Sequence, residues 1–78
     1  MTFFIVHGKD VIKMDQHVTE SEASFYQRVE FIVHALGRGH SVDAAHTLSY
    51  AYQNKLQYKV TYPALFEEDI KKIIDDMT

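Results

Sequence analysis

Five histidines are the residues best suited to chemistry in this 78-residue chain, because imidazole binds metals and transfers protons near neutral pH. His34, His40 and His46 recur six residues apart, whereas two ligands on one helical face need a spacing of three or four. Asp43 lies three residues before His46, and Glu30 lies four before His34, but a metal needs more than two such ligands. We therefore predict hydrogen-bonded or solvated histidines and no metal site. A pH-sensitive contact is the alternative.

Catalytic signatures are absent from the sequence. Serines are present, but neither a GxSxG nor an HExxH pattern occurs. The paired acids Glu67–Glu68 and Asp75–Asp76 are neighbours in a predicted helix, so they point apart and make a poor acid–base pair. We predict a protein that is not an enzyme, with no catalytic residue and no cofactor.

Nucleic-acid binding is the stronger competitor, since residues 33–55 have the helix–turn–helix order. Lys9 and Lys13 on one side of a predicted strand also resemble the outward face of a ribbon-helix-helix dimer. However, the second helix begins with Val42, Asp43 and Ala44, where a reading helix needs polar or basic side chains. The formal net charge of −3 further disfavours phosphate binding. A dimeric DNA-binding regulator is therefore the alternative.

Length and composition predict one domain spanning residues 1–78. The sequence contains 46% hydrophobic and 24% charged residues, which is typical of a globular protein. It has no cysteine, which excludes disulfides and fits a cytoplasmic location. No apolar run is long enough to cross a bilayer, and the start does not resemble a signal peptide.

The elements that must position any site begin with a predicted β-hairpin, in which two β-prone runs flank Gly8. The first run, TFFIVH, is so uniformly apolar that we expect it to be central in a sheet or covered. Thr19 and Glu22 form a predicted capping box that opens a helix, with Val18 packing on Ala23. Phe25, Val29, Ile32 and Leu36 line its buried face, and the glycines of GRGH end it.

A second helix is predicted to begin after Ser41, with Leu48 and Tyr52 on its buried stripe. The alternation in YKVTY predicts a strand near residues 58–62. Pro63 then suits the first turn of a last helix, in which Ile70 and Ile73 are buried. The predicted fold is α+β: a small antiparallel sheet, made of the N-terminal hairpin plus the strand near 58–62, packed with three helices.

Large side chains exceed what so short a chain can hide, so we expect some aromatic rings outside. Tyr50 and Tyr52 lie about 200° apart around a helix, so if Tyr52 is buried, Tyr50 points outward near His46. Tyrosine is enriched where proteins bind one another. The predicted partner-binding residues are Tyr26, Phe31, His46, Tyr50 and Tyr58.

These observations predict a small protein that acts by binding another protein or itself, as a regulator, adaptor or inhibitor. The predicted mechanism is burial of an apolar, tyrosine-rich surface, with the acidic last helix orienting the partner by charge. A two-fold symmetric homodimer is its simplest version.

Overall fold

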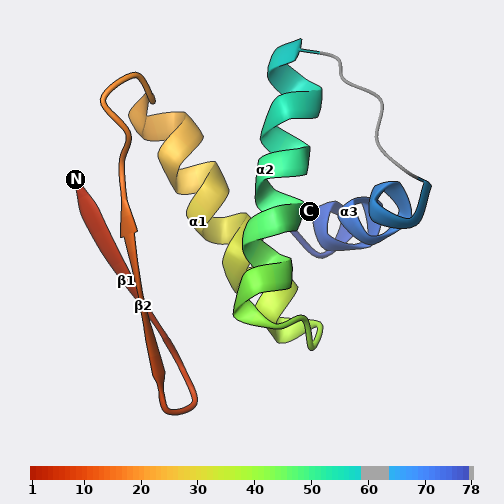
Figure 1. Ribbon diagram of the computed structural model, residues 1–78, viewed down its shortest axis with the longest axis horizontal. Coiled ribbons are helices and arrows are strands. Elements are labelled where there is room, and N and C mark those ends of the chain that lie inside the picture. Colours follow the sequence, from red (N-terminus) through yellow and green to blue (C-terminus); the bar gives the residue numbers. More distant parts are fainter. Residues whose placement is uncertain (59–63, 78) are drawn as a thin grey trace.

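A computed structural model of the protein describes the backbone of residues 1–58 and 64–77, and the side chains of 1–53 and 68–77. Its elements, in chain order, are β1 (Thr2–His7), β2 (Asp10–Asp15), α1 (Glu22–Gly37), α2 (Val42–Tyr58) and α3 (Ala64–Met77). Within these residues the sheet has two strands, so the predicted α+β class with a small antiparallel sheet and three helices is confirmed. The hairpin stands on one side of α1, and α2 and α3 lie on the other (Figure 1).

The predicted hairpin forms around a two-residue turn. His7 pairs with Asp10, so Gly8 and Lys9 make the turn. Gly8 has φ 61°, a left-handed conformation that two-residue hairpin turns require and that glycine adopts without a side-chain clash. Lys9 therefore lies in the turn rather than beside Lys13 on a strand, as the ribbon-helix-helix resemblance had placed it.

Helix α1 begins at a different cap from the predicted one. Ser21 is the N-cap, and its side chain accepts a hydrogen bond from the Ser24 amide at 3.1 Å. Val18 is fully exposed, so the predicted packing on Ala23 is wrong. The predicted capping box does not form, because Thr19 lies in a turn before the helix. In that turn Glu20 is bound by Arg28, and the helix begins at Glu22, two residues after Glu20.

Helix α2 starts as predicted, since the Ser41 hydroxyl accepts a hydrogen bond from the Ala44 amide at 3.2 Å. It continues to Tyr58, which is therefore the last residue of a helix and not the first of a strand. The rest of the strand predicted near 58–62 lies outside the described residues. In α3, the predicted burial of Ile70 and Ile73 is confirmed.

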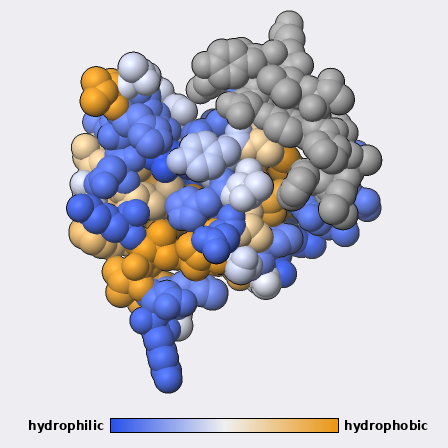
Figure 2. All heavy atoms as spheres, viewed as in Figure 1, coloured by the Kyte–Doolittle hydropathy of each residue, from blue (hydrophilic) through white to orange (hydrophobic). Residues whose placement is uncertain are grey.

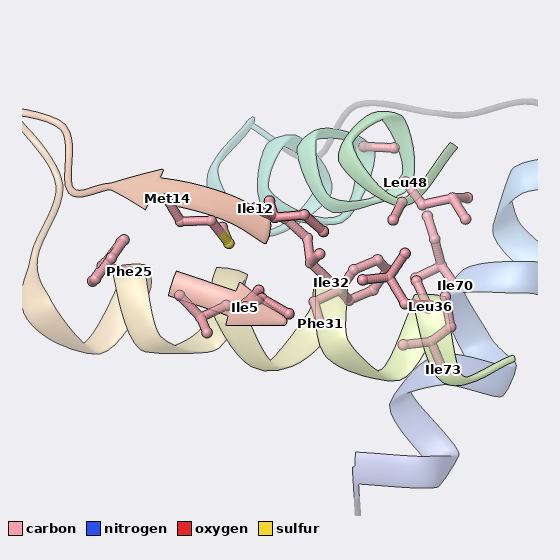
Figure 3. Packing of buried hydrophobic residues seen from close by; sticks show 14 residues of the cluster. Ile5, Ile12, Met14, Phe25, Phe31, Ile32, Leu36, Leu48, Ile70 and Ile73 are labelled. Atoms are coloured by element: carbon pink, nitrogen blue, oxygen red, sulfur yellow. The ribbon is translucent and has the colours of Figure 1, made fainter. Parts of the chain in front are cut away.

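The hydrophobic core lies where α1 meets its neighbours. Figure 3 shows Ile5, Ile12 and Met14 of the hairpin pointing toward α1, while Leu48 of α2 and Ile73 of α3 approach it from the other elements. The four residues predicted for the buried face of α1 are at most 4% exposed. Among the described residues, no helix has the length and apolarity of a membrane span.

Candidate functional site

A buried ion pair fixes the end of the hairpin to the helices. The Arg28 guanidinium donates to both carboxylate oxygens of Glu20, at 3.0 and 3.1 Å, and the two side chains are only 4% and 7% exposed. Arg28 also donates to the Asp15 carbonyl at 2.6 Å, and Gln53 of α2 donates to Glu20 at 3.3 Å. This network joins the last residue of β2 to α1 and α2, so it sets where the hairpin sits.

The charge of Glu20 is stabilised inside this network. Burial alone raises the pKa of Glu20, but hydrogen bonds from Arg28 and the His17 amide, together with the positive charge of Arg28, outweigh it. The pKa of Glu20 therefore lies below its ordinary value. The guanidinium also lies 5.3 Å from the centre of the Phe25 ring, which gives the buried cation a second favourable contact. The Arg28–Glu20 pair therefore has a structural role, because it connects β2, α1 and α2.

The predicted tyrosine surface is present in separate pieces. Tyr26 is 45% exposed on α1 and Tyr50 is 49% exposed on α2. His46, half-buried, lies one helical turn from Tyr50, on the side of α2 away from buried Leu48. Tyr26, by contrast, projects from α1 about 140° around the axis from Phe31, the α1 residue that faces α2. The two exposed tyrosines therefore do not form one surface.

Phe31 must be removed from the candidate binding residues. Its side chain is fully buried, and its ring stacks on Tyr52 of α2 with centroids 5.1 Å apart. The Tyr52 hydroxyl accepts a hydrogen bond from Gln27, which brings the two helices together. The side chain of Tyr58 lies outside the described residues.

An exposed apolar surface lies on the hairpin, which sequence reasoning did not single out. In the observed register, Thr2, Phe4 and Val6 of β1 share the outer side of the sheet with Val11, Lys13 and Asp15 of β2. Phe4, Val6 and Val11 are 60%, 74% and 65% exposed, and Val6 pairs directly with Val11. We call these three side chains the hairpin face. Hydrophobic atoms gather over the hairpin just above its hydrophilic tip (Figure 2).

The signal for this surface was the uniform apolarity of TFFIVH. It predicted a strand that is central or covered, and within the described residues β1 has one strand neighbour and a bare outer side. Only Ile5 of its six residues is buried. The sequence therefore predicted a cover for β1 that the described residues do not supply.

The titratable side chains of the described residues do not gather into a metal site. No group of three or more histidine, cysteine, aspartate or glutamate side chains could hold a metal ion in the part of the chain that the structure describes. The carboxylates with helical spacing to a histidine, Glu30 before His34 and Asp43 before His46, are not among the salt bridges of that part. No protein-family model, curated protein or solved structure matches this chain.

Proposed function

We propose that this protein binds another protein through the hairpin face and acts as a regulator, adaptor or inhibitor rather than as an enzyme. The observation that carries the proposal is the exposure of Phe4, Val6 and Val11 on one side of a two-stranded sheet. Five of the nine large hydrophobic residues that are exposed among the described residues belong to positions 1–15. Hydrophobic side chains gathered on one surface, rather than scattered singly, often mark a binding site.

The size of the face fits a modest binding surface. The three exposed side chains present roughly 300 Å² of apolar area, which is typical of functional patches on small proteins. Burying that area against a partner is worth about 7 kcal/mol before the cost of association is subtracted. Lys13 and Asp15 lie on the same outer side, where they can direct a partner by charge. The complementary partner is an apolar protein surface with a polar rim.

A dimeric DNA-binding regulator remains the alternative proposal. On the outer side of the hairpin it would depend on Lys13, which has Asp15 two residues away on the same side. That acid would repel phosphates beside the one strand lysine. Protein binding therefore has the better support.

The test is a pull-down from the source cells with quantitative mass spectrometry, comparing the wild type with Val11→Lys and Tyr50→Lys. Both changes introduce a lysine at a well-exposed position, so neither should unfold the protein. We expect Val11→Lys to lose the partner and Tyr50→Lys to retain it. Loss in Tyr50→Lys alone would move the binding surface to α2, and capture of nucleic acid that disappears at high salt would favour the alternative.

A further inference from the structure

Within the described residues, the backbone edge of β1 is a second uncovered feature of the hairpin. Phe4 and Val6 belong to both features, but the edge offers their backbone groups in the plane of the sheet, whereas the hairpin face offers their side chains. The Gln16 amide donates to the Met1 carbonyl at 2.9 Å, which fixes the alternation of the antiparallel ladder. Residues 1, 3, 5 and 7 then turn their backbone groups toward β2. Thr2, Phe4 and Val6 turn theirs outward, where the described part of the chain offers no neighbouring strand.

The two edges of the sheet differ in how well they are protected against pairing. On β2 the outward positions include charged Lys13 and Asp15, and the Asp15 carbonyl already accepts a hydrogen bond from Arg28. Charged side chains and occupied backbone groups are the usual means of blocking an edge. On β1 the outward residues are Thr2, Phe4 and Val6, which carry no charge, no proline and no bulge. The β1 edge is therefore the open one.

We infer that two copies of this protein pair β1 to β1, antiparallel, with Phe4 on the two-fold axis. In this register Thr2 lies opposite Val6 of the second copy and Phe4 lies opposite its own equivalent. Every outward amide and carbonyl then meets a partner, which gives six hydrogen bonds. A register shifted by two residues, centred on Ile5, would give four. The result is a four-stranded sheet with the order β2-β1-β1-β2.

Within the described residues, the side of α1 that is turned away from α2 also lacks a cover. The Arg28 network joins the end of β2 to α1 and, through Glu20 and Gln53, to α2. In Figure 3, β2, which carries Ile12 and Met14, is drawn nearer to α2 than β1, which carries Ile5. Val33 lies about 160° around the axis of α1 from Phe31, which stacks on α2, and Tyr26 lies within about 20° of Val33. Both are 45% exposed. We call these two side chains the α1 flank.

Edge pairing would bring the two α1 flanks together. Two strands at about 4.8 Å spacing separate the centres of the paired hairpins by about 10 Å, which is the usual distance between packed helices. In Figure 3, Met14 lies near Phe25, and Ile12 points toward Ile32. Phe4 pairs with Lys13, which lies between Met14 and Ile12 on β2. Phe4 is therefore level with the middle of α1. An axis through Phe4 therefore sets Tyr26 against Val33 of the second copy.

The area of this contact predicts a weak dimer. The edge residues and the α1 flank together offer roughly 400 Å² on each copy, or about 800 Å² in total, which is below the range of stable interfaces. We expect a dissociation constant on the order of 10–100 μM. Glu30 lies between Tyr26 and Val33 on the flank, so like charges meet across the axis. Added salt should screen them and tighten the dimer, which is opposite to its effect on phosphate binding.

The experiment is sedimentation velocity of the whole chain from about 1 μM to 1 mM, with three variants. Val6→Pro removes an outward amide without removing a β1–β2 hydrogen bond, so we expect affinity for the second copy to fall about 10- to 30-fold. Val33→Glu should weaken affinity for the second copy at least tenfold. Because Val33 is exposed on a helix, this variant should fold even if Val6→Pro does not. Val11→Lys changes only the hairpin face and should leave the dimer within twofold.

Amide exchange gives an independent readout in the same samples. The Phe4 and Val6 amides should be protected at 1 mM and exchange freely at 1 μM. A wild type that stays monomeric at 1 mM would overturn the inference and leave the edge for a strand of another protein. Dimerisation that resists both Val6→Pro and Val33→Glu, or that is lost in Val11→Lys, would also overturn it. Failure of the proposed function appears separately, as a partner that still binds Val11→Lys.

Discussion

Arg28→Met tests the buried ion pair that positions the hairpin. Methionine has similar length and no charge, so it leaves the Glu20 carboxylate buried without its main partner and frees the Asp15 carbonyl. Breaking a buried pair from one side costs about 3–5 kcal/mol. A core in a chain this short seldom supplies more than about 3–5 kcal/mol of net stability. We therefore expect Arg28→Met to be largely unfolded at 25 °C and neutral pH.

Urea unfolding followed by circular dichroism measures this loss, with Glu20→Met and the double variant completing a cycle. The double variant removes both charges together, so it should be more stable than the sum of the single losses predicts, by about 1–3 kcal/mol. Arg38→Ala is the matched control, because its ion pair with Asp76 is 36% and 42% exposed. An Arg28→Met variant that loses less than about 1 kcal/mol would refute the claim that this pair holds the hairpin.

Three further outcomes are expected. Phe31→Ala should cost about 3–5 kcal/mol in urea unfolding because the ring is fully buried. Tyr50→Ala should change stability by less than about 1 kcal/mol, because that ring is 49% exposed; equal losses in the two variants would return Tyr50 to the core. Because folding lowers the pKa of Glu20, its contribution to the free energy of unfolding is present above its unfolded pKa and is lost as the pH falls through its folded pKa. The Glu20→Gln variant should therefore lose less stability on acidification than the wild type. An unchanged dependence of stability on pH would contradict this. Arg38→Ala should shift the free energy of unfolding by less than about 1 kcal/mol, and a larger loss would mean that the ion pair with Asp76 is worth more than its exposure implies.

Local patterns in the sequence were sufficient for most elements. The period of three to four residues located the buried face of α1, and Ser41 located the start of α2. The predicted N-cap of α1 was wrong because Thr19 and Ser21 are both residue types that favour the N-cap position. The choice between them depends on Glu20, which binds Arg28 eight residues further along the chain. No helix-spacing rule predicts that contact, since the two residues do not share a helix.

The candidate surface shows where sequence patterns stop being informative. The angle of about 200° between Tyr50 and Tyr52 around α2 correctly placed Tyr50 outside and Tyr52 toward the core, but the stacking of Tyr52 on Phe31 was not predicted. It could not separate a buried Phe31 from an exposed one, because α1 is apolar on two adjoining sides and the position of α2 decides which is covered. The exposure of Phe4 and Val6 likewise depends on how many strands and helices meet the hairpin, which is a property of the whole fold.

The most direct test of binding through the hairpin face is site-specific photo-crosslinking in the source cells. A photoreactive phenylalanine analogue replaces Val11, and a matched protein carries it at Val18, which is fully exposed outside the hairpin. Crosslinks at Val11 to one discrete protein, absent at Val18, are the predicted result. Crosslinks of equal yield at both positions, or none at Val11, would contradict binding through the hairpin face.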